Sequence, residues 1–194
     1  FHVWNVERIR PRSLEPFDFT DANVSGELWL AEGGTNYYGA LVLKRAGLIT
    51  LDAMLERFSN VINTVALSPG RRLNSVVEMS RMAPFTDAAT AIDRTNFGNT
   101  FISYYIWGEA IGIGLDLALR EHTSNRVSLD DYMAALWTEF GRSNGGIPGV
   151  VDRPYTAHDA QRVLGLVASD SEFADQFFAR YIDGREVVDY TQLF

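Results

Sequence analysis

Hydrophobic residues recur along most of this chain at intervals of three and four, which is the spacing of one face of an α-helix. The pattern predicts a helix over residues 51–65, with Thr50 as its cap and Pro69 and Gly70 closing it. We expect its apolar face to lie in the core. That face comprises Leu51, Met54, Leu55, Phe58, Val61, Ile62 and Val65.

Capping signals predict further helices in the C-terminal part of the chain. Ser128 with Asp131, and Thr156 with Asp159, have the spacing of a capping box, in which each side chain bonds the other residue's backbone N–H. Gly141 is expected to end the first of these helices. The apolar stripes are Leu129, Tyr132, Met133, Leu136, Trp137 and Phe140 in the first helix, Ala160, Val163, Leu164 and Val167 in the second, and Phe173, Phe177, Phe178 and Tyr181 in a third that ends before Gly184.

Residues 103–121 are apolar on nearly every face, a pattern typical of a helix buried in the middle of a bundle. Gly108, Gly112 and Gly114 in this segment are places where a neighbouring backbone can approach closely. Strand signals are almost absent, and residues 81–98 and 142–154 lack periodicity and are predicted to be long loops. The sequence therefore predicts a mainly α fold, a helical bundle that forms a single domain over residues 1–194.

Composition excludes several classes of protein. Hydrophobic residues make up 46% and aromatic residues 12% of the sequence, which is incompatible with a disordered chain. A formal net charge of -8 gives no basic surface for nucleic acid. The sequence holds no apolar run long enough for a transmembrane segment and no cysteine. The compartment, cytoplasmic or periplasmic and secreted, stays open.

The sequence contains three histidines, and their neighbours distinguish them. His122 follows the apolar segment, where its cation favours the C-terminus of a helix. His158 lies in the first turn of a capped helix among polar residues and is expected at the surface. His2 is preceded by Phe1, and this pair fits the last two positions of His-Glu-x-x-His, in which two histidines on one helix face bind zinc.

A carboxylate among apolar residues is the second chemical feature. Glu32 lies in LWLAEGGTNYYGALVLKRAGLIT, which reads as a helix. A carboxylate buried there must be paired, protonated or bound to a metal. Glu32 is therefore a candidate ligand.

The stretches FHVWNVERIRP and LWLAEGGTNYYGALVLKRAGLIT together resemble the glycyl aminopeptidase family, which comprises zinc peptidases of the gluzincin type that carry a PDZ domain. In that family HExFHVWNxKRIRP is followed about thirty residues later by WxxEGxTxYY. Five further blocks follow the family's order over nearly the whole chain. They are SPGRRLNSVVE, SYYIWGEAIGIGLDLALRE, SLDDYMAALWTEFG, YTAHDAQRVLGLVA and FFARYIDGREVVDY.

The resemblance implies a site, a cofactor and a missing part. His2 corresponds to the second zinc histidine, Glu32 to the third ligand, and Tyr105 to a tyrosine whose hydroxyl stabilises the tetrahedral oxyanion. The implied fold is the C-terminal helical lobe of a gluzincin catalytic domain, cut inside the zinc motif. The upstream β domain, the first histidine, the general-base glutamate and the downstream PDZ domain would belong to the complete parent.

Two residues depart from the family pattern. Trp107 stands where lysine is usual, and Gly34 stands where a larger apolar residue is usual. Residues 81–99 also match poorly, so a preference for N-terminal glycine is not implied. The substrate side of the pocket is where we expect this chain to differ from its relatives.

Three hypotheses follow. In the first, the chain is part of a zinc aminopeptidase that removes N-terminal residues, such as Gly or Ala, from peptides. Alone it would hold zinc weakly and be inactive without its N-terminal half. In the second, it is a degenerate peptidase-like module that binds a peptide or a protein partner. In the third, it is a plain helical bundle without a ligand.

Overall fold

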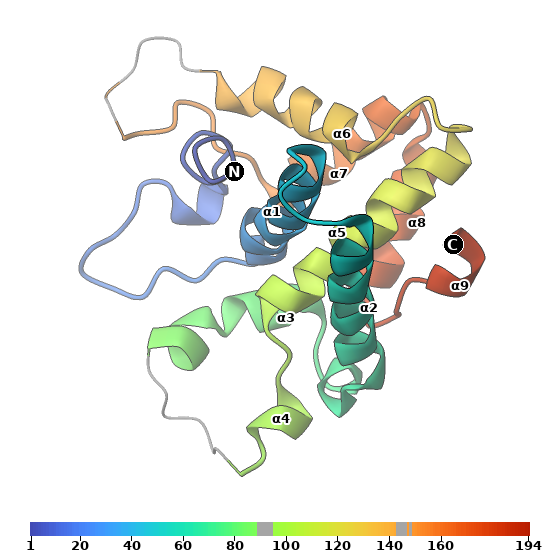
Figure 1. Ribbon diagram of the computed structural model, residues 1–194. Helices are drawn as coiled ribbons and strands as arrows, with labels where there is room; N and C mark the ends of the chain where they lie inside the picture. Colours follow the sequence, from blue (N-terminus) through green and yellow to red (C-terminus); the bar gives the residue numbers. More distant parts are fainter. Residues whose placement is uncertain (89–94, 143–146, 148) are drawn as a thin grey trace.

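The protein is a bundle of helices, as predicted. The computed structural model describes residues 1–88, 95–142, 147 and 149–194, and within these ranges there is no β-strand. Figure 1 shows the helices gathered around α5. They are α1 (Gly34–Arg45), α2 (Leu51–Leu67), α3 (Val76–Arg81), α4 (Phe97–Thr100), α5 (Tyr104–His122), α6 (Leu129–Leu136), α7 (Ala157–Ala168), α8 (Ser171–Phe177) and α9 (Tyr190–Leu193).

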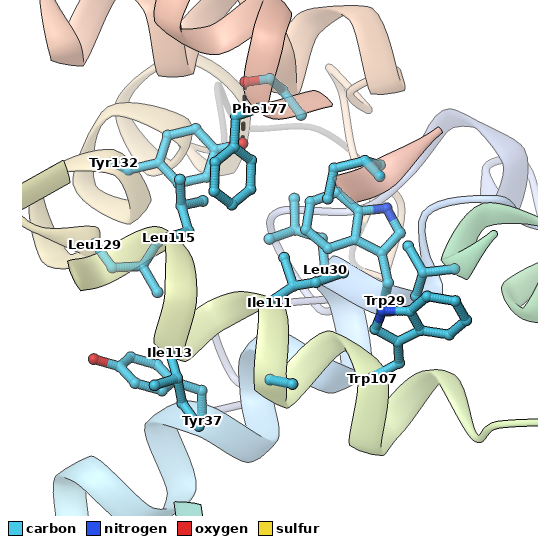
Figure 2. Packing of buried hydrophobic residues seen from close by; sticks show 14 of the residues in the cluster. Trp29, Leu30, Tyr37, Trp107, Ile111, Ile113, Leu115, Leu129, Tyr132 and Phe177 are labelled. Atoms are coloured by element: carbon cyan, nitrogen blue, oxygen red, sulfur yellow. Dashed lines mark hydrogen bonds between the residues drawn. The ribbon is translucent and has the colours of Figure 1, made fainter. Parts of the chain in front are cut away.

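The apolar helix α5 is the centre of the bundle. It packs against α1, α2, α3, α6 and α9, so almost every face of it is covered. Side chains from α5 and its neighbours meet in one hydrophobic cluster, where Trp107 and Ile111 of α5 join Trp29 and Leu30 (Figure 2). The prediction of a buried helix over residues 103–121 is confirmed.

The predicted caps form as the sequence indicated. The hydroxyl of Thr50 accepts a hydrogen bond from the N–H of Ala53 at 3.1 Å. The backbone N–H of Ser128 donates to the Asp131 carboxylate at 2.8 Å, which closes the first capping box. Thr156 forms the second box with Asp159 at the start of α7. These bonds satisfy N–H groups that the helix itself leaves unpaired.

Some local predictions are wrong. Leu51 and Leu55, assigned to the core face of α2, are 52% and 41% exposed. The stretch 81–98 was expected to be a loop, yet it holds the π-helical turn Pro84–Ala88 and the start of α4. Part of that stretch (89–94) and part of the second predicted loop (143–146 and 148) lie outside the described residues. The packing of α2 on α5 decides which side chains of α2 are buried, and the spacing of apolar residues alone does not determine this.

Polar contacts connect the helices at defined points. Asp116 of α5 accepts from the Tyr37 hydroxyl of α1 at 3.0 Å and from the Leu129 N–H at the start of α6 at 2.7 Å. Glu109 of α5 is 1% exposed and is paired with Arg57 of α2, whose Nε lies 2.7 Å from Oε1. A buried carboxylate needs such a partner because its desolvation is otherwise uncompensated. These contacts fix α1, α2 and α6 on the central helix.

Candidate metal centre

His2 lies on a single helical turn at the beginning of the chain. The N–H of Asn5 donates to the carbonyl of Phe1 at 3.2 Å, which is an α-helical bond. The N–H of Glu7 then bonds the His2 carbonyl at 3.2 Å, and Val6 has a φ of 83°. This is the left-handed ending typical of a helix C-terminus, although a β-branched residue is strained there. The turn presents His2 at its surface.

Glu32 lies on a π-helical segment, Trp29–Gly33, that leads directly into α1. In such a segment each N–H bonds a carbonyl five residues back, and here the N–H of Gly34 donates to Trp29. Segments of this kind occur frequently at functional sites, because the extra residue redirects a side chain. The sequence predicted a helix here but not its widened form.

A close backbone contact holds this segment on α5. A Cβ added to Gly33 would lie 2.3 Å from the Cα of Gly108, and a Cβ on Gly108 would lie 2.1 Å from the Trp29 carbonyl oxygen. No side chain fits at either position. The prediction of close backbone approach is confirmed for Gly108, whereas Gly112 and Gly114 meet the side chains of Tyr37 and Val188.

The structure brings the two predicted ligands together. Nε2 of His2 lies 3.2 Å from Oε2 of Glu32, and the side chains are 50% and 19% exposed, so the pair faces solvent on one side. Nδ1 of His2 lies 3.3 Å from the carbonyl oxygen of Asn5. The ring thus has an oxygen acceptor at each nitrogen. Either the hydrogen of Nε2 or a metal ion can lie between this nitrogen and the carboxylate.

This donor set fits zinc. Two ligands at about 2.0–2.1 Å from a tetrahedral zinc ion lie about 3.3 Å apart, close to the observed separation of 3.2 Å. A histidine that donates from Nδ1 to a carbonyl leaves the lone pair of Nε2 for the metal. Within the described residues no three His, Cys, Asp or Glu side chains gather into a complete metal site. The role of His2 and Glu32 as ligands stays a prediction.

Tyr105 lies in the first turn of α5, where its N–H donates to the Ser103 hydroxyl at 3.3 Å. It precedes Gly108 by three residues and so lies on the same face of α5. Since Gly108 contacts Gly33, the neighbour of Glu32, the chain carrying Tyr105 approaches the segment that carries the carboxylate. The phenol is half-buried, and its role at an oxyanion stays a prediction.

The two departures from the family pattern have different consequences. Trp107 is 2% exposed and belongs to the hydrophobic core, so its side chain packs inside the bundle. A Cβ at Gly34 would make only ordinary contacts, 3.6 Å from Leu30 and 3.8 Å from the Asn5 side chain. We expected these positions to change the substrate side of the pocket, and for Trp107 its burial argues against that.

The other histidines lie away from this pair. His122 is in the last turn of α5, as predicted for a C-terminal cation, and its Nε2 lies 3.3 Å from the Asp170 carboxylate. Its ring also stacks on Phe173 with a centroid distance of 4.6 Å. His158 is exposed, as predicted. His122 thus has a structural contact with α8, which the sequence did not indicate.

Aromatic packing positions the turn that carries His2. The ring of Phe1 stacks on Tyr38 of α1 at 4.2 Å with an interplanar angle of 7°. The hydroxyl of Tyr38 donates to Asp130 at 2.9 Å, and Arg45 pairs with the same carboxylate at 2.7 Å. Burial raises the pKa of Tyr38, so its hydroxyl remains a donor. Asp130 therefore supports, through Tyr38 and Phe1, the chain next to His2.

Replacing Asp130 with asparagine is expected to remove an acid-dependent part of the stability. Desolvation opposes ionisation of Asp130, but hydrogen bonds from Arg45 and Tyr38 outweigh it and lower its pKa below the ordinary 3.8. A pKa lowered by folding stabilises the protein above about pH 4, and this contribution is lost as the pH falls through the folded-state value. Because the carboxylate is partly exposed, the effect is about 1 kcal/mol or less.

Urea unfolding of the wild type and Asp130→Asn between pH 7 and pH 3 measures this contribution. The difference in free energy of unfolding is expected to shrink towards acid pH. Asp52→Asn is the control, since Asp52 is exposed on α2. A difference that is the same at all pH values would contradict the assignment.

Comparison with known proteins identifies the family of this chain and a solved structure with the same fold. The sequence profile described as M61 glycyl aminopeptidase matches residues 1–111. The chain belongs to that family. The crystal structure of an aminopeptidase N family protein from Idiomarina loihiensis superimposes on this chain with a TM-score of 0.83 and 25% sequence identity. The match covers 100% of this chain and 31% of the Idiomarina chain. No curated protein matches the sequence.

The chain spans about a third of that relative's length, since it covers 31% of it. Its helical bundle has the same fold as the corresponding part of an aminopeptidase N family protein. Among the described residues, none of the helices is both long and apolar enough to cross a membrane.

Proposed function

We propose that this chain is part of the catalytic domain of a zinc-dependent aminopeptidase, in which His2 and Glu32 are two of the zinc ligands. The supporting observation is the separation of 3.2 Å between Nε2 of His2 and Oε2 of Glu32. A surface ion pair of the same geometry would be worth little to stability. Together with the family membership, the pair is better explained as a ligand set.

Each residue has a distinct role in the proposed site. The His2 imidazole binds through Nε2 while its Nδ1–H donates to the Asn5 carbonyl, which fixes the tautomer and the ring orientation. The negative charge of the Glu32 carboxylate would neutralise part of the positive charge of the zinc ion. When bound, zinc supplies Lewis acidity towards the scissile carbonyl and towards water. The Tyr105 hydroxyl donates a hydrogen bond to the oxygen of that carbonyl as negative charge develops on it.

The proposed activity belongs to the complete parent protein. The first histidine and the general-base glutamate of His-Glu-x-x-His are not in this sequence. With two protein ligands, the chain would hold zinc weakly, and it offers no base for hydrolysis. The proposed reaction is removal of an N-terminal residue, such as Gly or Ala, from a peptide with a free amine.

The test uses the parent protein and this chain side by side. We expect the parent to contain about one zinc ion per molecule and to hydrolyse glycyl and alanyl anilides, because hydrolysis needs the complete site. The N-acetylated anilides are the control and should not be cleaved. A chelator should remove the activity, and added zinc should restore it. This chain alone should be inactive.

Two outcomes would contradict the proposal. A parent without zinc and without hydrolysis would favour the degenerate module that binds a peptide or a protein partner. Hydrolysis by the isolated chain would show that its own residues form a complete site.

A further inference from the structure

Asn5 lies between the two predicted ligands and contacts the chain on both sides. Its backbone carbonyl accepts from Nδ1 of His2 at 3.3 Å. Its side-chain nitrogen donates to the carbonyls of Leu30 at 3.0 Å and Ala31 at 2.8 Å, the residues directly before Glu32. The residue is fully buried, with 0% of its surface exposed. One side chain therefore connects the turn of His2 to the segment of Glu32.

The chemistry of its neighbours fixes the orientation of the Asn5 amide. Backbone carbonyls can only accept, so the group that faces Leu30 and Ala31 must be the NH₂. The Thr35 hydroxyl gives its own proton to Ala31 at 2.7 Å and so accepts from Asn5 at 3.1 Å. Three acceptors thus surround one amide nitrogen. An oxygen in its place would meet the lone pairs of all three.

The Asn5 amide contacts the Glu32 segment where that segment is π-helical. The N–H of Gly34 bonds Trp29, five residues back, so the usual pairing of Leu30 with Gly34 is not made. The Asn5 amide supplies a donor to the carbonyls at this junction. The Ala31 carbonyl also accepts from the Thr35 hydroxyl, so the Asn5 amide adds a further donor to this part of the segment. The amide of Asn5 therefore ties the π-helical segment that carries Glu32 to the turn that carries His2.

We infer that Asn5 is a positioning residue that holds His2 and Glu32 at ligand distance from each other. It touches neither substrate nor metal and acts through the two residues that it joins. The inference rests on the proposed function for its consequence, which is zinc affinity. The geometric part, the separation of the two side chains, can be measured without metal.

The first experiment measures that separation in the metal-free chain. Nuclear Overhauser contacts between the His2 ring and the Glu32 γ-protons are expected in the wild type and are expected to be lost in Asn5→Ala. Asn60→Ala, an exposed asparagine on α2, is the control and should retain them. Persistence of the contacts in a folded Asn5→Ala chain would overturn the inference.

The second experiment measures zinc affinity of the same variants by following the His2 ring resonances. Loss of a hydrogen bond to a metal ligand weakens metal binding by about 10–100-fold; Asn5→Ala removes only the amide and keeps the carbonyl that His2 contacts, so we expect a loss of about 10-fold, the low end of that range. Asn60→Ala should keep the wild-type zinc affinity. Wild-type affinity in a folded Asn5→Ala chain would overturn the inference.

The proposed ligand pair and the positioning role of Asn5 can be disproved separately. If His2→Ala and Glu32→Ala leave zinc binding unchanged, the proposed ligand pair is wrong, and the Overhauser measurement still decides the role of Asn5. If Asn5→Ala does not fold, the wild-type chain is tested instead, by measuring hydrogen exchange of the Asn5 side-chain amide with and without zinc. Zinc bound at His2 should then slow the solvent exchange of the Asn5 amide protons. Unchanged exchange at saturating zinc would overturn the inference.

Discussion

Replacing Glu32 with alanine is expected to abolish zinc binding and peptidase activity of the parent protein while the bundle stays folded. The carboxylate is one of the proposed ligands, and without it a metal-dependent reaction falls towards the uncatalysed rate, a loss of several orders of magnitude. The fold should survive because the ion pair with His2 is half-exposed on the histidine side. Loss of activity without unfolding is the expected signature of a ligand.

Zinc content, anilide hydrolysis and thermal unfolding of the variant measure these effects. Glu56→Ala is the matched control, since Glu56 is an exposed glutamate on α2. It should leave all three properties unchanged. A Glu32→Ala parent that keeps its zinc and its activity would exclude Glu32 as a ligand.

Replacing Gly108 with alanine is expected to have the largest effect on stability. The new Cβ would lie 2.1 Å from the Trp29 carbonyl oxygen and 2.9 Å from the Cα of Gly33, so backbone rather than a flexible side chain must move. Overpacking of a buried contact costs about 1–3 kcal/mol, and a clash between two backbones exceeds that range. Because Glu32 adjoins Gly33, any variant that folds should also have a displaced carboxylate.

Gly39→Ala is the matched control for this substitution. Gly39 also lies within a helix, α1, but nothing lies within 4 Å of its added Cβ. Alanine there should stabilise the chain by about 0.5–1 kcal/mol through its helix propensity. Denaturant unfolding of both variants measures the difference. Equal stabilities would contradict the close packing of the π-helical segment on α5.

Local signals made the helices of this protein predictable. The caps at Thr50, Ser128 and Thr156 and the all-apolar segment that became α5 depend on residues within a few positions of one another. A capping bond or a helical stripe is formed by neighbours in the chain, so its pattern is legible without knowledge of the fold. The stripe of α2 was less reliable, since Leu51 and Leu55 remain exposed.

The candidate site was predictable only in part. His2 and Glu32 were recognisable from the resemblance, yet their separation of 3.2 Å depends on residues thirty positions apart. Asn5 was missed, because nothing in VWNVE indicates that its amide reaches the carbonyls of Leu30 and Ala31. Its sequence signals are its place in the motif HExFHVWNxKRIRP and its polar side chain among apolar neighbours, three positions after a candidate ligand.

The sequence by itself determined the helical class, the starts of α2, α6 and α7, the candidate ligands and the resemblance to the family. Tertiary structure alone decided which face of α2 is buried, that Trp107 belongs to the core, and that the Glu32 segment is π-helical against Gly108. The physical reason is the range of the interactions. Caps and periodicity act within one or two turns, whereas the distance between His2 and Glu32 is set by packing between segments that the chain itself holds far apart.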